Sequence, residues 1–346
     1  MDENEAQSQN KKQSKTNVNI IPGVLFVTGI AIVAYFIGML FPIIGGAISG
    51  IVIGILLNYF LGTSDQFSAG IDFTLKRLLK LAIILLGFSF YLTDIVSVGK
   101  NSIIIVMVTV VAGLLLTYFI GKAFGLHGNT SFLIGSGTAI CGATAIVTLS
   151  PIIKAKEEEL TYAVNTIFAF NVLAILAFPF IGKMVTMSDY YFGIWAGAAI
   201  HDTSSVVAAG YAFSDEAGAV SVIVKLARTL MLIPLALGVA IFHSIQSKKK
   251  QAHSEVNKVN ILNVFPYFIL LFVAVALINT FIPLPSFIPD VAEKTAKFLI
   301  VMVMVSVGLK TDIHKIGRVG YKPLIVGLIA SLLISVISIS LIYILV

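Results

Sequence analysis

The sequence predicts an all-α membrane protein with about eleven transmembrane helices, on the strength of its composition and its apolar runs. Hydrophobic residues make up 58% of the 346 residues, charged residues only 12%, and the mean hydropathy is +1.00. An ordinary soluble domain has about 25% charged residues, so a water-soluble core cannot accommodate this composition. Apolar runs of about 20 residues, the length that crosses about 30 Å of hydrocarbon, recur along nearly the whole chain.

The elements follow one another in a simple order. Residues 1–19 are polar and lack apolar periodicity, which predicts a disordered cytoplasmic tail. The segment after Asn19 is long enough to span and has no small-residue cleavage site, which favours a retained anchor. A basic cytoplasmic linker, 244–262, separates helices 1–8 (20–243) from helices 9–11 (263–346). The expected spans lie near 20–40, 44–62, 77–95, 101–121, 130–153, 160–182, 190–212, 217–243, 263–281, 296–309 and 323–345.

The net charge of +6 is explained by membrane topology. With a cytoplasmic N-terminus, most Lys and Arg fall in cytoplasmic loops, including Lys248–Lys250, while Lys154 and Lys156 fall on the opposite side. This bias predicts a multi-pass protein of the cell membrane, with the N-terminus inside and the C-terminus outside. The basic residues form no contiguous face, so the lipid bilayer is an expected partner and nucleic acid is not.

Cysteine and histidine usage argues against disulfides and metals. Cys141 is the single cysteine, so no disulfide framework exists, and the five histidines are scattered without ligand spacing. We therefore expect no metal and no cofactor.

Two internal echoes suggest repeats. Residues 137–147 are echoed by 197–207, and Thr93-Asp94-Ile95 with Gly99 is echoed by Thr311-Asp312-Ile313 with Gly317. Many secondary transporters are built from inverted repeats with the substrate site at midplane. The second echo joins spans that run in opposite directions. In a count of eleven, the first echo joins spans of the same direction, unless one span is re-entrant or miscounted, and short apolar matches also arise by chance.

The first echoed segment predicts a broken helix. Gly135-Ser136-Gly137-Thr138 and Gly142-Ala143-Thr144 disfavour a continuous helix, because each glycine costs about 1 kcal/mol relative to alanine. A break at membrane depth is tolerated only inside protein or beside a wet cavity. Half-helix N-termini there would offer N–H groups to an anion, and C-termini would offer carbonyls to a cation. The alternative is that these small residues allow close helix packing.

The second echoed segment, His201-Asp202-Thr203-Ser204-Ser205, places an ionisable pair and hydroxyls between apolar runs. A charge at bilayer depth costs about 2.5–3.5 kcal/mol even on insertion scales, which favours a functional site. The alternatives are that Asp202 or Thr203 is simply the N-cap of a half-helix and that His201 is a satisfied bundle histidine. We expect the two broken segments to face each other near midplane.

Lys225 and Arg228 lie on one helical face, deep within a later span. They would supply positive charge to an anionic substrate or form a charge-coupled gate. The alternatives are snorkelling to the interface, or a structural ion pair with Asp202. Lys225 and Asp202 are predicted to be energetically coupled. Weaker signals are Thr161, Asn165 and Asn171, whose polar groups are expected to point inward.

The motifs at these positions resemble a known family. The stretches 139–145, 152–159 and 199–210 closely resemble the YeiH-type family of bacterial membrane proteins, whose members are often described as sulfate exporters. The resemblance implies a secondary transporter, distantly related to cation/proton antiporters and bile-acid-type anion transporters. It also implies crossed broken helices in a core that moves against a panel of helices.

The function predicted from these features is export or exchange of a small inorganic or organic anion, such as sulfate, another oxyanion or a sulfonate. The runner-up is a cation/proton antiporter in which Asp202 titrates and Lys225 competes with the cation. An intramembrane hydrolase using Ser136, Ser204 and His201 is disfavoured, because Gly135-Ser136-Gly137 is no nucleophile elbow, and no enzyme is expected. The coupling ion, a proton or sodium, and a homodimer stay open. The expected substrate-binding residues are Ser136, Gly137, Thr138, Cys141, Gly142, Thr144, Asn165, His201, Asp202, Thr203, Ser204, Lys225 and Arg228.

Overall fold

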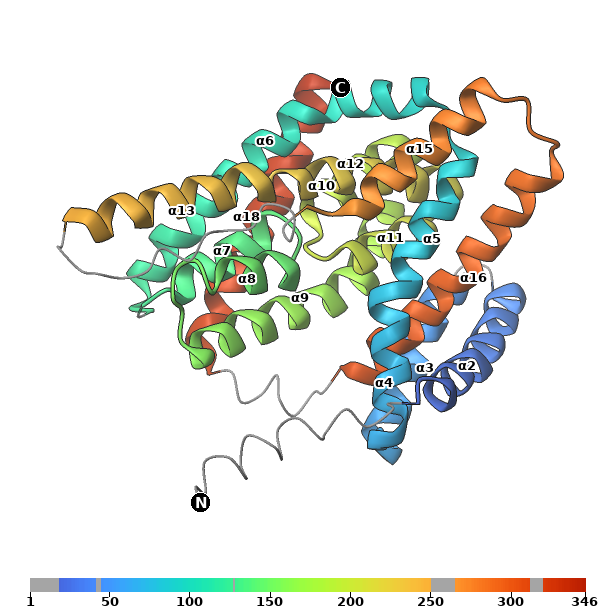
Figure 1. Cartoon of the computed structure of the whole chain (residues 1–346), viewed down its shortest axis with the longest axis horizontal. Coiled ribbons are helices and arrows are strands. Elements are labelled where there is room, and N and C mark those ends of the chain that lie inside the picture. The colour runs from blue at the N-terminus through green and yellow to red at the C-terminus, as the bar shows by residue number, and fades with distance from the viewer. Residues whose placement is uncertain (1–18, 42–44, 127, 250–264, 312–319) are drawn as a thin grey trace, which may run out of the picture.

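The computed structural model describes residues 19–41, 45–126, 128–249, 265–311 and 320–346, in which every regular element is a helix (Figure 1). The helices are α2 (Ile21–Leu40), α3 (Gly45–Leu61), α4 (Asp65–Phe73), η1 (Thr74–Leu78), α5 (Leu79–Leu86), η2 (Gly87–Ser89), α6 (Leu92–Ala123), α7 (Thr130–Ala139), α8 (Ala143–Leu149), α9 (Glu157–Met184), α10 (Asp189–Ala199), α11 (Thr203–Phe213), α12 (Asp215–Leu230), α13 (Leu232–Lys249), α15 (Tyr267–Phe281), α16 (Phe287–Lys310) and α18 (Tyr321–Leu345). The all-α membrane class is therefore confirmed at the level of helix content.

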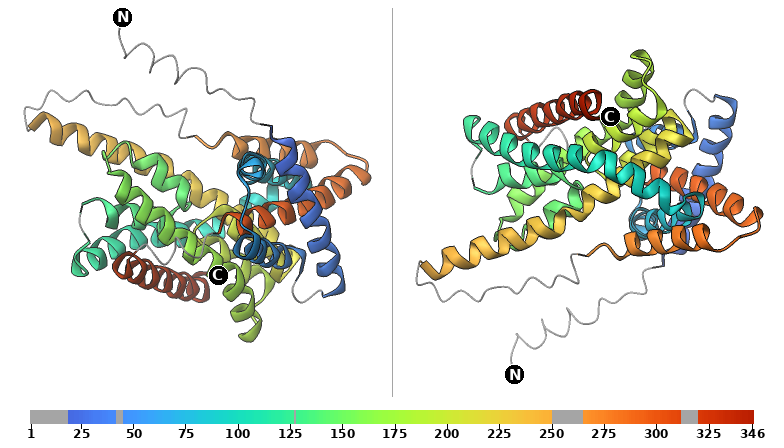
Figure 2. Two further views of the ribbon diagram at one scale, coloured as in Figure 1. Left: turned by 90° about the horizontal axis from the view of Figure 1, so that it is seen from below. Right: turned by 90° about the horizontal axis from the view of Figure 1, so that it is seen from above.

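The helices form two groups that lie at opposite ends of the molecule (Figures 1 and 2). We call α2–α5, α15 and α16 the panel, and α6–α12 with α18 the core bundle. The two groups meet where α11 packs against α3 and α16 and where α6 packs against α15. The chain-order division at the linker 244–262 thus does not match the spatial grouping, because α15 and α16 return to the panel and α18 returns to the core bundle.

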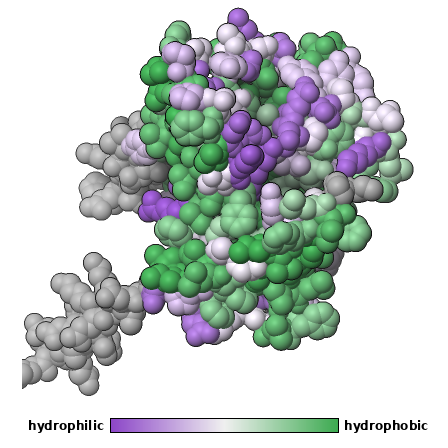
Figure 3. Space-filling view, turned by 90° about the vertical axis from the view of Figure 1, so that its right-hand side faces the viewer, coloured by the Kyte–Doolittle hydropathy of each residue, from purple (hydrophilic) through white to green (hydrophobic). Residues whose placement is uncertain are grey.

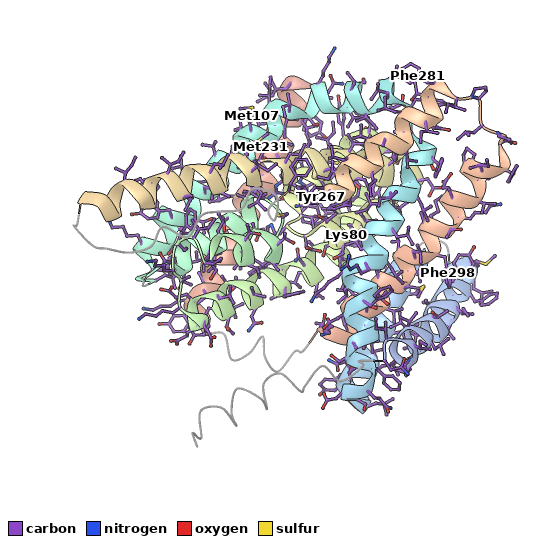
Figure 4. All side chains as sticks on the ribbon, viewed as in Figure 1. Lys80, Met107, Met231, Tyr267, Phe281 and Phe298 are labelled. Carbon is purple, nitrogen blue, oxygen red and sulfur yellow. The ribbon has the colours of Figure 1, made fainter. Side chains whose placement is uncertain are left out.

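Glycines and aromatic rings hold the panel together. A Cβ at Gly54 of α3 would stand 2.5 Å from the carbonyl oxygen of Val305 on α16, so these two backbones approach closely where small residues allow it. Phe298 of α16 points toward α2, where its ring lies 6.1 Å from that of Tyr35 (Figure 4). Figure 4 also places Lys80 beside the start of α15, and its ammonium lies 5.8 Å from the centre of the Phe268 ring.

The helix ends define two sides of the molecule. On side A, the amide of Asn58 near the end of α3 donates to the carbonyl of Thr311, which follows α16. On side B, the backbone N–H of Leu92 at the start of α6 donates to Thr280 near the end of α15. Helices α6, α9 and α18 each run between the two sides. Side A therefore carries the starts of α2, α9 and α18, and side B carries the ends of α9, α15 and α18.

Two of the expected spans are helical hairpins. Hairpin 1 is α7–α8: the N–H of Asn129, before α7, donates to Glu159 Oε1 at the start of α9 (2.9 Å), so α8 leads back to side A. Hairpin 2 is α10–α11, whose base is closed on side B by the stacked rings of Phe192 and Phe213, 3.9 Å apart. The count of eleven spans is not confirmed, because apolar length alone cannot distinguish one crossing from two half-length arms folded together.

The hairpins also explain the first sequence echo. Residues 137–147 and 197–207 include the breaks of hairpins 1 and 2, which enter from opposite sides, so the re-entrant option stated above is the one the structure contains. The second echo cannot be compared, because 312–319 lie outside the described residues, as do the tail 1–18 and most of the linker. Helix α13 runs to Lys249 and so extends into the segment expected to be linker.

The described residues contain five helical segments that are long and apolar enough to cross a membrane: Ile21–Leu40, Leu92–Ala123, Glu157–Met184, Asp215–Phe242 and Tyr321–Leu345. Two shorter apolar helices, Gly45–Leu61 and Tyr267–Phe281, add to them. Large apolar side chains such as Leu40, Phe60 and Phe180 are exposed on the surface, and Figure 3 shows broad hydrophobic areas on the panel end. A surface of this kind indicates a lipid environment.

Candidate functional site

The tips of the two hairpins touch in the middle of the core bundle. Tip 1 is 140–142, between α7 and α8, and tip 2 is 200–202, between α10 and α11. A Cβ at Gly142 would lie 3.3 Å from Cβ of Asp202, and Gly142 has φ +62°, a conformation that glycine adopts without strain. The two segments are therefore interrupted helices that face each other, as the sequence predicted.

Lys225 of α12 joins the two tips. Its side chain is fully buried. The ammonium donates to the carbonyls of Ile140 (2.7 Å), Ile200 (3.0 Å) and His201. An ammonium has three N–H donors, so these three carbonyls use its whole hydrogen-bonding capacity.

Arg228, one turn further along α12 and also fully buried, binds the same helix ends. Its Nε donates to the carbonyl of Ala139 (2.6 Å), Nη1 to that of Ile200 (3.0 Å) and Nη2 to that of Thr138. The last carbonyls of α7 and α10 have no helical partners and carry the negative end of each helix dipole, so two cations are stabilised there.

The close approach of α12 to hairpin 2 depends on glycines. A Cβ at Gly197 of α10 would stand 2.9 Å from the carbonyl oxygen of Ser221, and one at Gly210 of α11 would stand 2.8 Å from Cα of Gly218. Any larger residue at either position would push α12 away. The small residues of 197–210 thus place Lys225 and Arg228 within reach of the tips, which is the packing role weighed above, in addition to the helix break.

Asp202 does not form the predicted ion pair with Lys225. Its Oδ2 accepts hydrogen bonds from the N–H (2.9 Å) and the hydroxyl of Ser204, which makes Asp202 the N-cap of α11. Among the described residues, no ion pair within 4 Å includes Asp202. The capping interpretation of this residue is correct. The backbone N–H of Asp202 donates to Oδ1 of Asn171 on α9 (3.1 Å), which fixes tip 2 against α9.

His201 connects both tips to α18. Its Nδ1 lies 3.2 Å from the carbonyl oxygen of Thr138, and Nε2 lies 2.8 Å from the hydroxyl of Ser331. The Ser331 hydroxyl also lies 2.6 Å from the carbonyl oxygen of Gly327. A carbonyl oxygen can only accept, so a neutral imidazole donates its one N–H from Nδ1 to Thr138 and accepts the hydroxyl of Ser331 at Nε2. His201 is therefore a satisfied bundle histidine.

The small and hydroxyl residues of α7 serve the helix itself. The hydroxyls of Ser136 and Thr138 donate to the carbonyls of Leu133 (2.9 Å) and Ile134 (2.7 Å), one turn earlier. A Cβ at Gly137 would stand 2.8 Å from the side chain of Ile146 on α8, so Gly137 lets the two arms of hairpin 1 pack. None of these hydroxyls is free to bind a ligand through its proton in this state.

Several other expected residues lie elsewhere. Cys141 is buried at tip 1 and Thr203 is half-buried at the start of α11, but Thr144 is exposed on α8. Asn165 is half-buried on α9 without a hydrogen bond to the described residues, and Asn171 instead contacts tip 2. Thr161 is exposed, so the expectation that it points inward is wrong. A helix side chain's direction depends on the helix rotation, which these short polar signals do not fix.

Sequence reasoning missed Ser331 as a site residue. It lies in an otherwise apolar span, with Ser335 four residues later and Ser338 beyond it. Ser335 also accepts a hydrogen bond from the indole of Trp195 on α10 (3.2 Å). A stripe of serines at helical spacing on α18 is therefore the signal that would have predicted a face turned toward hairpin 2.

A second polar contact joins panel and core bundle on side B. The ammonium of Lys297 on α16 lies 2.8 Å from Asp215, the first residue of α12, and 2.8 Å from Glu293. The same ammonium lies 5.9 Å from the centre of the Tyr211 ring on α11. Beside it is a cavity of about 220 Å³ lined by Tyr35, Gly38, Met39, Gly46, Ala47, Tyr211, Asp215, Lys297, Ile300 and Val301.

Comparison with known proteins places this architecture in a family. The family model described as "Conserved hypothetical protein 698" matches residues 22–327. A UPF0324 membrane protein of Clostridium tetani is 39% identical over 329 residues, covering 91% of this chain and 94% of its own. UPF0324 membrane proteins of Streptococcus pyogenes serotype M18 and Streptococcus mutans serotype c are each 36% identical, covering 94% and 92% of this chain and 97% and 95% of their own. No solved structure matches.

The matched residues extend from the first helix of the panel into α18, so they include both hairpin tips and both buried cations. The chain therefore belongs to the YeiH-like UPF0324 family of membrane proteins.

Proposed function

We propose that this protein is a secondary active transporter that carries a small anion across the cell membrane by alternating access. The observation that carries the proposal is the meeting of two hairpin tips, from opposite sides, around buried Lys225 and Arg228. Broken helices at membrane depth are typical of transporter substrate sites, where inverted elements converge at midplane. A purely structural bundle would have no need to bury two cations there.

The local charge supports an anion as the substrate. Lys225 and Arg228 carry two formal positive charges, and Asp202 is the one carboxylate within the two tips. The carbonyls of α7 and α10 stabilise the cations but carry no net charge. Because every N–H of Lys225 is already bound, an anion at the tips would be attracted by the field of Lys225 and would need its direct hydrogen bonds from other groups.

Alternating access would come from movement of the core bundle against the panel. The groups share few contacts, and the Lys297–Asp215 ion pair joins them on side B. In this proposal the structure is closed on side B, and opening toward that side requires the ion pair to break. Lys122 and Lys322 lie on side A, and hairpin 1 returns Lys154 and Lys156 to the same side, in contrast to the expectation from eleven spans. The positive-inside bias therefore supports a cytoplasmic side A, with the start of α2 inside and the end of α18 outside.

The test of anion transport is flux in proteoliposomes. Vesicles loaded with radiolabelled sulfate and containing the purified protein should lose label faster than protein-free vesicles, and an Arg228→Met variant should abolish the difference. A panel of other oxyanions and organosulfonates added outside should identify exchange substrates. If neither sulfate nor any of these anions moves above background, anion transport is refuted.

Cation/proton antiport remains the second candidate because of one observation. Asp202 is half-buried, and among the described residues its carboxylate is bound by Ser204 alone, through Oδ2, which leaves Oδ1 for a cation. Antiport predicts that sodium and pH, rather than oxyanions, change the melting temperature, and that Asp202→Asn removes this response. The anion proposal predicts the opposite selectivity in the same measurement.

A further inference from the structure

A cleft on side A lies apart from the hairpin tips. Its volume is about 450 Å³, and it is lined by Gly125, Leu126, Thr130, Lys156, Glu158, Glu159, Tyr162, Gly320, Tyr321, Lys322 and Pro323. Thr130 is the first residue of α7 and Ala139 is the last, so the cleft lies about 14 Å from tip 1 along the helix rise. The residues that surround it come from the turn before α7 and from the starts of α7, α9 and α18, and none belongs to the two tips.

Three helices begin at this cleft. Helix α7 starts at Thr130, α9 at Glu157 and α18 at Tyr321. The first N–H groups of a helix lack helical partners, and each N-terminus is equivalent to about half a positive charge. The N-caps of α7 and α18, Asn129 and Gly320, make no side-chain capping hydrogen bond.

Two lysines add full positive charges to the same cleft. Lys156 and Lys322 are exposed, and neither belongs to an ion pair within 4 Å among the described residues. The ammonium of Lys322 lies 3.7 Å from the position that a Cβ at Gly125 would occupy, so it extends from α18 across to the turn before α7. Gly125 has φ +66°, which a residue with a side chain adopts only with strain.

The two carboxylates in the cleft are occupied. Glu159 accepts the backbone N–H groups of Asn129 (2.9 Å) and Lys156 (2.9 Å), one on each oxygen. Glu158 accepts the phenol hydroxyl of Tyr162 (2.8 Å). These bonds hold the base of hairpin 1 to α9, and the two carboxylates offset the partial positive charge at the start of α9. The start of α7 is thus already next to the carboxylate of Glu159, whereas the two lysines and the start of α18 have no anionic partner in the described part of the chain.

Thr130 points independently to a ligand. Its residue is 5% exposed and lines the cleft, yet its hydroxyl makes no hydrogen bond to the described residues. The oxygen of Thr130 is not among the fully buried unpaired atoms of the described residues, so it is open to the cleft, where water or a ligand can satisfy it.

We propose that this cleft is a binding site for a tetrahedral oxyanion group, a phosphate or a sulfate, held by Lys156, Lys322, the hydroxyl of Thr130 and the N–H groups that begin α7 and α18. The same chemistry is presented by a free inorganic anion and by the headgroup of an anionic phospholipid. The site joins the bases of α7 and α18, which carry tip 1 and Ser331. An anion bound there would therefore restrain hairpin 1 relative to α18, independently of what the tips transport.

The experiment uses the full-length protein and inorganic phosphate or sulfate at constant ionic strength, with chloride as the reference salt. Detergent-solubilised protein and nanodiscs of phosphatidylcholine test the free anion, and native mass spectrometry with phosphatidylglycerol added to phosphatidylcholine tests the headgroup. The variants are Lys156→Gln/Lys322→Gln and Thr130→Val. Lys154→Gln is the matched control, because Lys154 is exposed in the same loop but does not line the cleft.

The expected result is that phosphate or sulfate raises the melting temperature, or that phosphatidylglycerol is retained, in the wild type and in Lys154→Gln alike. The double lysine variant should weaken the interaction about tenfold or more, and Thr130→Val should weaken it less. A response to free anions identifies a soluble oxyanion, and retention of phosphatidylglycerol alone identifies a headgroup. Equal responses in the wild type and both cleft variants, or no response to any probe, overturn the proposal. Because Arg228→Met should leave this response intact, failure here and failure of anion transport are distinguishable.

Discussion

Replacing Lys225 by methionine tests the central contact of the site. The change removes the three hydrogen bonds that Lys225 donates to Ile140, Ile200 and His201. Hydrogen bonds to a charged group contribute about 1.5–3 kcal/mol each, but relief of the buried charge offsets part of this loss. We expect a net destabilisation of about 3–5 kcal/mol, which is the part of the hydrogen-bond loss that relief of the buried charge does not offset.

The double variant Lys225→Met/Asp202→Asn distinguishes the contacts seen in the structure from the Lys225–Asp202 ion pair that the sequence suggested. Asparagine is a good N-cap, so Asp202→Asn alone should cost less than about 1 kcal/mol. Since Lys225 binds carbonyls and Asp202 binds Ser204, no direct ion pair is lost, and the double variant should be no more stable than Lys225→Met alone. The assay is equilibrium unfolding in a mild detergent, with Lys154→Met as an exposed control. Recovery of the double variant to near wild-type stability would refute this reasoning, because only a direct ion pair gives that rescue.

Three further predictions follow from the geometry. Gly142→Ala should lower stability by about 1–3 kcal/mol, measured as a reduced melting temperature, because φ +62° with ψ −133° is a conformation that residues with a side chain rarely adopt. Single cysteines placed at Lys154 and at Lys183 should differ in intact cells, where an impermeant reagent should label only the cysteine at 183. Labelling at 154 alone would support eleven spans instead of hairpin 1. The native Cys141 is buried and should give little background. Lys297→Met should increase labelling of a cysteine at Tyr211 from outside, because the ion pair that closes side B is lost; unchanged labelling would show that the pair does not gate access.

The positions of the helix breaks could be predicted from sequence because their signals are local. Gly142 and its neighbours disfavour a continuous helix wherever they occur, and the polar cluster at 201–205 cannot face lipid whatever its partners are. Both breaks lie where these residues stand, and Asp202 caps α11 as its residue type indicates. The constant spacing between the two echoed segments could also be read from the sequence, because it too depends only on the local residue pattern.

The partners of the charges could not be predicted in this way. Lys225 binds backbone carbonyls, and carbonyls are present at every residue, so the sequence contains no signal that marks those of Ile140 and Ile200. Asp202 is the one carboxylate within the two echoed segments 137–147 and 197–207, so the residue types alone favoured an ion pair. The difference between Asn165 and Asn171 is likewise set by which face of α9 meets tip 2, and that depends on the packing of the whole core bundle.

By itself, the sequence determined the membrane class, the helical content, the two breaks and the depth of the cations, because each follows from the local cost of placing polar or flexible residues in hydrocarbon. Only the tertiary structure decided that two apolar runs fold into opposed hairpins, that α15 and α16 return to the panel, and that the cations bind helix ends. The physical reason is that apolar length alone does not distinguish one crossing from two packed arms. Contacts such as that of Phe192 with Phe213, at the two ends of the same apolar run, decide between these two arrangements.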